Sequence, residues 1–296
     1  GGLIIDMENV NQRTLKQRFA SRKHDPVSLI LFGFVYLAAF VSFLMIAFII
    51  SYILVKGVPH SNKGLFSLTY TTDNVSLLPA LINTVFITIL TLLIAVPIGI
   101  GGSIYLTEYA KRDNPIVNII RIATETLSGI PSIIYGLFGA LFFVKYAHFG
   151  LSLLSGAVTL SIMILPLIMR TTEEALLSVP NSYREGAFAL GAGKLRTIFK
   201  IVLPSAMPGI FPGVILAIGR IIGESAALIF TAGTVAEVAK SVFSSSRTLA
   251  VHMYAISGEG LYINQTYATA VVLLILVIGI NFLSGLIAKR LGSENG

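Results

Sequence analysis

"RTTEEALLSVPNSYREGAFALGAGKLRTIFKIVLP", residues 170–204, is a charged segment that separates two long uncharged runs. Pro180 interrupts its first stretch, Asn181 or Ser182 can cap a short helix, and the "GAG" of residues 191–193 supplies a turn. Apolar residues then recur at helical spacing, at Leu195, Ile198, Phe199 and Val202. The pattern predicts a helix, a turn and a second helix. Periodicity alone leaves two interpretations open, a compact surface that docks on a cytosolic protein or a loop that lies on the membrane.

The runs on either side of this segment belong to a strongly apolar chain. Of its 296 residues, 55 % are hydrophobic and only 12 % are charged, and the mean hydropathy is +0.85. Such a composition excludes an ordinary soluble protein. A helix needs roughly 20 apolar residues to cross the hydrocarbon layer. We therefore expect an all-α polytopic membrane protein with six transmembrane helices, at residues 27–55, 79–107, 127–144, 151–169, 206–230 and 267–288.

The basic residues predict the orientation of these spans. With the N-terminus inside, 15 of the 21 Lys and Arg residues fall in cytoplasmic segments, five in outer segments and one, Arg220, in a span. Both termini are therefore expected in the cytoplasm. We expect a cytoplasmic N-terminal segment (1–26), a six-helix membrane domain (27–288) containing the charged segment 171–204, and a cytoplasmic tail (289–296). Basic loops beside an anionic leaflet explain the net charge of +7 without a nucleic-acid partner.

The charged segment carries a long motif. It resembles the cytoplasmic signature of the permease subunits of ABC importers, E-A-A, three residues, G, nine residues, I-x-L-P. The corresponding positions are Glu185, Gly186, Ala187, Gly191, Ile201, Leu203 and Pro204. Gly186 stands where the family usually has alanine. The resemblance implies a type I ABC importer permease fold, in which this segment is a pair of coupling helices that docks on the ATP-hydrolysing subunit.

Two further stretches narrow the resemblance. "LSGIPSIIYGLFG", residues 127–139, is similar to a stretch shared by the phosphate-importer permeases. "GRIIGESAALIFTAG", residues 219–233, resembles the G-R-x-x-G-E-T-A-P-L stretch of the phosphate permeases of the PstA type, with Ser225 and Ala227 as departures. The resemblance implies a permease subunit of an ATP-driven phosphate importer in a prokaryotic cell membrane. Its implied partners are a homologous PstC-like permease, two copies of a cytosolic ATP-binding subunit, an extracytoplasmic phosphate-binding protein and phosphate itself.

Arg220 and Glu224 are the charged residues of the fifth expected span. A lone arginine in the bilayer costs at least roughly 2.5 to 3.5 kcal/mol, so it should face protein or water and have a partner. Glu224, four residues on, and Thr231, eleven on, would share its helix face. One interpretation is that Arg220 attracts a passing phosphate, because its fork of donors matches an oxyanion, while Glu224 holds the guanidinium or accepts a hydrogen bond from the protonated face of hydrogen phosphate. The other is that the pair only fastens the helix to a neighbour.

Other chemistry is not indicated. The glycines of "PIGIGGS", residues 97–103, lack the Gly-Lys-Ser/Thr of an ATP-binding loop and predict close helix packing or a kink. We therefore expect no ATPase site, no catalytic residue and no cofactor in this chain. His148 and His252 lack ligand-spaced partners, so no metal site is expected. The alternatives left open are a permease for another oxyanion and a secondary anion transporter independent of an ATPase. The outer segment 232–266 is a candidate contact for the binding protein.

Overall fold

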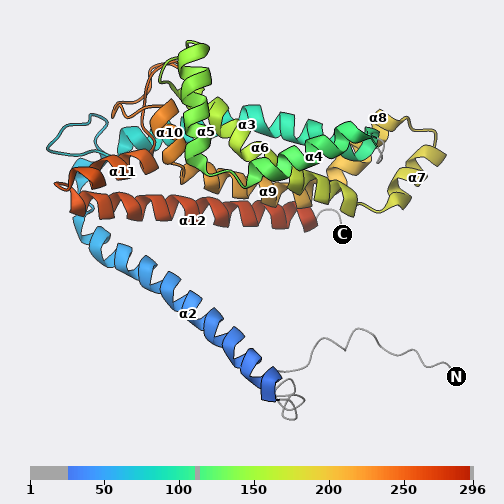
Figure 1. The fold of residues 1–296 in the computed structure, drawn as a ribbon, viewed down its shortest axis with the longest axis horizontal. Coiled ribbons are helices and arrows are strands. Elements are labelled where there is room, and N and C mark those ends of the chain that lie inside the picture. The colour runs from blue at the N-terminus through green and yellow to red at the C-terminus, as the bar shows by residue number, and fades with distance from the viewer. Residues whose placement is uncertain (1–25, 111–113, 294–296) are drawn as a thin grey trace. The chain divides into compact units, whose positions relative to one another are not determined.

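The computed structural model describes residues 26–110 and 114–293 (Figure 1). The chain separates into two compact units, Gly1–Val55 and Lys56–Gly296. The described residues form helices and no strand. An all-helical chain therefore agrees with the sequence-based prediction.

The described part of the first unit lies in one long helix. This helix, α2 (Pro26–Gly57), begins at a proline, which is tolerated there because the first N–H groups of a helix have no partner within it. Large apolar side chains cover every side of α2, among them Val35, Phe43 and Phe48. A helix that is apolar all round is stable only within lipid or against other protein. The helix coincides with the expected span 27–55.

The second unit contains the remaining helices and three π-helical stretches. In chain order they are η2 (Val58–His60), η3 (Lys63–Phe66), α3 (Leu78–Ile104), η4 (Tyr105–Tyr109, π), α4 (Pro115–Ser128), α5 (Ser132–Gly139), η5 (Ala140–Tyr146, π), α6 (Leu153–Ser178), α7 (Asn181–Ala189), α8 (Lys194–Thr197), η6 (Ile198–Val202, π), α9 (Leu203–Ile222), α10 (Ala226–Thr231), α11 (Leu249–Glu259) and α12 (Ile263–Ser293).

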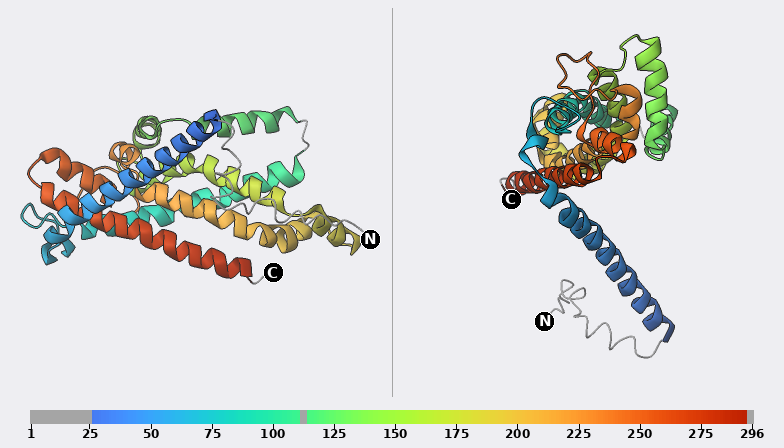
Figure 2. Two further views of the ribbon diagram at one scale, coloured as in Figure 1. Left: turned by 90° about the horizontal axis from the view of Figure 1, so that it is seen from below. Right: turned by 90° about the vertical axis from the view of Figure 1, so that its left-hand side faces the viewer.

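Helix α6 lies at the centre of this unit. It packs against α3 on one side and α9 on another, and α12, red in Figure 2, runs beside α9. The core between these helices contains fully buried Ile87, Leu160 and Ile221. A Cβ built on Gly99 would lie 2.6 Å from Cγ2 of Ile168, so α3 and α6 approach too closely for a side chain there. The prediction of close helix packing at these glycines is confirmed at Gly99.

The expected spans differ from the observed helices in two places. Among the residues that the structure describes, five helical runs are long and apolar enough to span, and a sixth exists if α4 with α5 and η5 counts as one span. That pair bends by 106° at residues 129–131. Pro131 disfavours helical conformation in Ile130 and starts α5 anew, which accounts for the bend. The third expected span, which the sequence already shows to be interrupted by Pro131, is therefore a bent pair of helices that begins at Pro115.

The expected fifth span, 206–230, is also wrong at both ends. The helical run already begins at Lys194, continues through η6 into α9, and stops at Ile222. The π turn η6 ends two residues before Pro204, which has no N–H to donate and crowds the carbonyl of residue 200. Widening the helix there relieves that crowding and lets the run continue.

The two ends of the second unit carry different segments. Helices α7 and α8 lie at the end where α12 terminates, whereas α10 and α11 lie at the opposite end (Figure 1). Asn83 of α3 fastens the loop that follows α10, because its side-chain amide donates to the Glu237 carbonyl at 2.8 Å and accepts from the Ala239 N–H at 2.9 Å. The loop is thus held against α3.

Candidate functional site

The helix that carries Arg220 ends two residues after it. Gly223 caps α9 at Ile222, and the chain then breaks before α10. Glu224 is buried in this break, with 9 % of its surface exposed. Its Oε1 accepts a hydrogen bond from the N–H of Ala227 at 3.1 Å. Because the first N–H groups of a helix lack internal partners, the Glu224 carboxylate caps α10.

This geometry corrects the expectation of one continuous polar helix face. Arg220, Glu224 and Thr231 do not share a helix, and within the described residues Arg220 and Glu224 form no salt bridge with each other. The helical periodicity does not continue past Ile222, because Gly223 ends α9 and the Glu224 carboxylate caps the new helix α10. The Glu224 carboxylate caps α10 and forms no ion pair with the Arg220 guanidinium.

Arg220 itself is exposed, in the last turn of α9. It makes no hydrogen bond or ion pair to another residue that the structure describes, and its charge interacts electrostatically with Tyr135 of α5. A guanidinium without a carboxylate partner keeps all five N–H donors available to a ligand. The arrangement suits recognition of an oxyanion.

The break between α4 and α5 lies beside the break between α9 and α10. Tyr135, buried in α5, bridges its own break by donating its hydroxyl to the Leu127 carbonyl at 2.7 Å. Helix α5 packs closely on α10, with backbone near backbone at Gly136, where a Cβ would lie 2.8 Å from Cα of Ala227. The two stretches singled out in the sequence, 127–139 and 219–233, therefore converge in the fold.

Thr231 lies inside this contact rather than on an open surface. It is fully buried, and its hydroxyl donates to the Ala227 carbonyl at 2.8 Å. A Cβ on Gly139 of α5 would lie 2.6 Å from its Cγ2. Thr231 therefore packs α10 against α5 and does not line the same face as Arg220.

The segment 171–204 folds as the sequence predicts, into a helix, a turn and a second helical arm. The hairpin formed by α7, α8 and η6 turns at Gly191, whose φ of +77° is the left-handed conformation that favours glycine. The Ala192 N–H donates to the Ala187 carbonyl at 3.0 Å and closes the turn. Ile198 and Val202 pack into a core with Leu176 of α6.

The signature residues divide between the core and the surface of this hairpin. Ala187 is buried and Ile201 and Leu203 are half-buried, whereas Glu185, Gly186, Gly191 and Pro204 are exposed. The tip is apolar as well as exposed: Leu190 has 90 % of its surface exposed, and Leu195 has 64 %. Exposed apolar clusters mark interaction surfaces.

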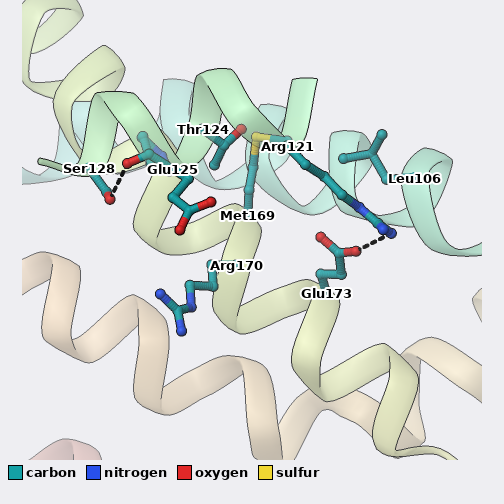
Figure 3. Close-up of a pocket in the computed structure, with 9 residues that line it drawn as sticks. Leu106, Arg121, Thr124, Glu125, Ser128, Met169, Arg170 and Glu173 are labelled. Atoms are coloured by element: carbon teal, nitrogen blue, oxygen red, sulfur yellow. Dashed lines mark hydrogen bonds and ion pairs between the residues drawn. The ribbon is translucent and has the colours of Figure 1, made fainter. Parts of the chain in front are cut away.

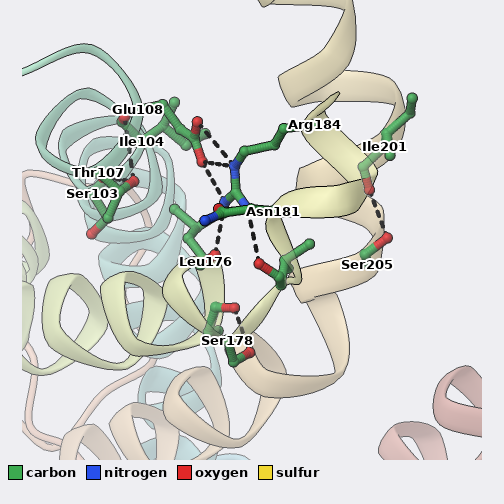
Figure 4. A network of polar contacts seen from close by, with 12 residues as sticks. Ser103, Ile104, Thr107, Glu108, Leu176, Ser178, Asn181, Arg184, Ile201 and Ser205 are labelled. Carbon is green, nitrogen blue, oxygen red and sulfur yellow. Dashed lines mark hydrogen bonds and ion pairs between the residues drawn. The ribbon is translucent and has the colours of Figure 1, made fainter. Parts of the chain in front are cut away.

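Arg184 fixes the hairpin to the rest of the second unit (Figure 4). Its Nη2 lies 2.7 Å from Oε1 of Glu108 and its Nε 3.1 Å from the same oxygen. The remaining donors reach the carbonyls of Leu176 and Val179, at 3.0 and 2.9 Å. Removing either partner of such a shielded pair would strand a charge.

A cavity of about 240 Å³ lies between α4 and α6 and contains further charges (Figure 3). Arg121 and Glu173 form a salt bridge of 2.6 Å across it, and Arg170 bonds to Glu174 on its own helix at 3.0 Å. Both arginines are therefore already neutralised by carboxylates. Glu125 adds another negative charge to the lining, so the cavity does not favour an anion.

Sequence reasoning missed the residues that join these elements. Tyr135, Gly136 and Arg184 lie inside or beside stretches singled out by their motifs, but a motif does not say which distant segment they contact. The sequence position of Glu108 is one indication that could have been used, because this carboxylate comes just after the apolar run 79–107. Opposite charges at span ends are a reason to look for a partner such as Arg184.

Comparison with known proteins places the chain in a family. Residues 98–293 match the family described as the binding-protein-dependent transport system inner membrane component. This chain belongs to that family. As a family member with several long apolar helices, it is a multi-pass membrane protein.

Individual relatives agree with the family. The probable ABC transporter permease protein YqgI of Bacillus subtilis is 36 % identical over 231 residues, which cover 71 % of this family member and 76 % of the relative. The phosphate transport system permease protein PstA of Haemophilus influenzae is 37 % identical over 219 residues, covering 73 % and 76 %.

A solved structure shares the fold. A bacterial ABC transporter involved in the import of the acidic polysaccharide alginate matches with a TM-score of 0.67 at 15 % identity, covering 93 % of this chain and 99 % of that one. At that identity the likeness concerns the fold alone. This likeness confirms the predicted all-helical fold of an ABC importer permease. The number of spans and the side on which the termini lie stay predictions.

Proposed function

We propose that the chain is a PstA-type permease subunit of an ATP-driven phosphate importer in a prokaryotic cell membrane. The family match and the relatives support the importer class, and the name of the Haemophilus relative supports phosphate. In this proposal both termini are cytoplasmic, a PstC-like permease completes the path, and two ATP-binding subunits supply the energy. A phosphate-binding protein delivers substrate at the outer face, where the segment 232–266 is a candidate contact.

The position of the unpaired Arg220 side chain is the main structural support for phosphate as the substrate. It lies at a helix break, exposed and without a carboxylate partner among the described residues. Two breaks face each other there, and broken helices often line the substrate path of a transporter. A single guanidinium attracts phosphate but binds it more weakly than a site with several ligands would. Conduction requires such weak binding, because the substrate must also leave the site. Glu224 and Thr231 support this site indirectly, by capping and packing α10.

The hairpin supports coupling to the ATPase. Glu185, Gly186, Ala187, Gly191, Ile201, Leu203 and Pro204 lie in it or at its junction with α9. The exposed Leu190 and Leu195 give it an apolar tip that a groove in a partner would bury. A secondary transporter has no need of such a surface, so the hairpin favours the ATP-driven interpretation.

Phosphate uptake by the assembled complex tests the role of Arg220. Arg220→Gln should abolish uptake while the complex still assembles, because the side chain is exposed and supports no neighbour. Arg220→Lys should recover little, since a point charge lacks the planar fork. Glu224→Gln is the matched control, because its amide oxygen can still cap α10 while the charge is lost.

Three results would contradict the proposal. Near-normal uptake by Arg220→Gln at normal membrane abundance would remove Arg220 from the path. Uptake of sulfate in preference to phosphate by the unmodified complex would point to another oxyanion, and uptake without the ATP-binding subunits would point to a secondary transporter.

A further inference from the structure

The π-helical end of α3 contacts both arms of the hairpin through two adjacent side chains. Glu108 of η4 accepts from Arg184 of α7 at 2.7 and 3.1 Å. The next residue, Tyr109, lies under Lys194 of α8, whose Nζ is 4.7 Å from the ring centroid. One short segment therefore holds the helix before the Gly191 turn and the helix after it.

The contact at Glu108 is shielded from solvent, unlike a typical surface ion pair. The Arg184 and Glu108 side chains have 16 % and 10 % of their surface exposed, whereas Arg170 and Glu174, a comparable pair on α6, have 76 % and 64 %. Shielded charges interact more strongly than exposed ones, because water screens them less. The same guanidinium also donates to two carbonyls at the end of α6. The Arg184 side chain thus joins the hairpin to both η4 and α6.

Helix α3 continues from η4 to the opposite end of the second unit. The run Leu78–Tyr109 contains 32 residues, which corresponds to about 48 Å of helix. At its far end Asn83 bonds to the loop after α10 through Glu237 and Ala239. A displacement at Glu108 would therefore reach the loop through a single packed helix.

We propose that Glu108 and Arg184 link the hairpin rigidly to α3, so that α3 carries the motion of the ATPase to the outer loop around Glu237. Both are positioning residues, and Tyr109 with Lys194 forms a second, weaker contact in the same link. This inference rests on the proposed function, because it assigns the path by which ATP-driven movement of the hairpin reaches the outer surface.

The ratio of phosphate taken up to ATP hydrolysed tests the link. Glu108→Gln keeps the shape of the side chain and removes its charge. In the complete complex, reconstituted in vesicles with the binding protein, the ratio should fall about tenfold while ATP hydrolysis continues, since coupling factors between sites run from roughly 5- to 150-fold. A purely structural defect would lower uptake and hydrolysis together. Arg170→Gln, which breaks the exposed pair, is the control and should keep the ratio.

A covalent replacement for the ion pair provides a second, independent test. The sequence has no cysteine, so the double variant Glu108→Cys with Arg184→Cys can be joined selectively by a short bis-maleimide. Before the reaction the double variant should be uncoupled. After cross-linking, the ratio of phosphate taken up to ATP hydrolysed should return to most of its value in the unmodified complex. The proposal requires that the hairpin and α3 move together, and the cross-link enforces this. This arm decides the question if Glu108→Gln assembles poorly.

Three outcomes overturn the inference. An unchanged ratio in Glu108→Gln would show that the pair transmits nothing, and a cross-linked variant that stays uncoupled would show that the two segments must separate during the cycle. If the unmodified complex shows no ATP-driven phosphate uptake, the proposed function falls and the inference falls with it. Normal uptake by the unmodified complex with a normal ratio in the variants refutes the link alone.

Discussion

At the scale of single residues, two glycines of the hairpin have opposite roles. Gly186 lies within α7, and a Cβ there would meet nothing within 4 Å. Gly191 also has open space, but its φ of +77° is a conformation that other residues rarely adopt. Position 186 can therefore accept a side chain, whereas the backbone conformation at position 191 favours glycine although space is available there.

Gly186→Ala should stabilise the hairpin and Gly191→Ala should destabilise it. Alanine at 186 favours the helix by roughly 0.5 to 1 kcal/mol, and alanine at 191 must adopt a left-handed conformation that costs roughly 1 to 2 kcal/mol. Thermal unfolding of the purified permease in detergent measures both. Equal midpoints for the two variants would contradict the backbone argument, since their side chains are identical.

A second cluster of residues predicts a dependence on pH. His252 of α11 and Arg247 are both buried, and both contact Tyr70: the two rings meet edge-on at 6.1 Å, and the Arg247 Cζ lies 4.5 Å from the Tyr70 ring centroid. Burial, and then the charge of Arg247, lower the pKa of His252 from 6.5 to about 3. The imidazole is therefore neutral in the folded protein.

The folded protein should lose stability as the pH falls below 6.5. In the unfolded chain His252 takes up a proton near pH 6.5, but in the folded chain it stays neutral until about pH 3. Between these values each pH unit costs about 1.4 kcal/mol of unfolding free energy. Unfolding midpoints at pH 7.5 and 5.5 measure the loss. His252→Leu should reduce the difference, whereas exposed His60→Gln should not; equal differences would contradict the assignment.

At the scale of elements, the contact between α5 and α10 decides how the two helix breaks face each other. Glycine at 136 lets the backbones touch, and Tyr135 and Thr231 hold the surrounding turns. Arg220 and Tyr135 are brought together by this contact, although 85 positions separate them in the sequence. The position of the guanidinium therefore depends on two short helices.

Gly136→Ala should separate α5 from α10. Its Cβ would lie 2.8 Å from Cα of Ala227, and a backbone atom cannot rotate away. Overpacking of this kind costs roughly 1 to 3 kcal/mol. Gly101→Ala in α3, where a Cβ meets nothing within 4 Å, is the control and should not destabilise. Thermal unfolding compares them, and similar midpoints would show that α10 can shift freely.

Sequence patterns predicted the long elements better than their junctions. The apolar runs gave α2, α3, α6 and α12 because lipid or core burial demands such runs whatever their neighbours are. The break at Gly223 was not predictable, since it depends on whether the Glu224 carboxylate caps a new helix or faces Arg220. The surroundings of that cap include α5, which packs on α10 from a distant part of the sequence and is not visible in the local pattern.

At the scale of the whole molecule, the segments assigned to the two sides of the membrane lie at opposite ends of the second unit. Residues 58–77 and α11 lie at one end, and α7 and α8 at the other (Figure 1). This separation agrees with the sidedness expected from the basic residues. The orientation itself stays a prediction.

Single cysteines in the cysteine-free chain test that orientation. Asn62→Cys and Ser241→Cys should react with an impermeant thiol reagent from outside sealed cells, and Ser182→Cys should react only after the membrane is opened. All three positions are exposed, so access to the reagent depends on the side of the membrane and not on burial. Labelling of the Ser182 variant in sealed cells would reverse the topology.

The bare tip of the hairpin has a consequence for how cells make this protein. Leu190 and Leu195 are exposed in the isolated chain, and in the proposed orientation their turn lies in the cytoplasm, where proteases and chaperones act. In a copy synthesised in excess of its ATP-binding partner, these two leucines would stay uncovered. We expect such an unassembled subunit to be degraded. Its lifetime in the membrane should therefore follow the supply of that partner, which would keep the subunits in proportion without any control of their genes.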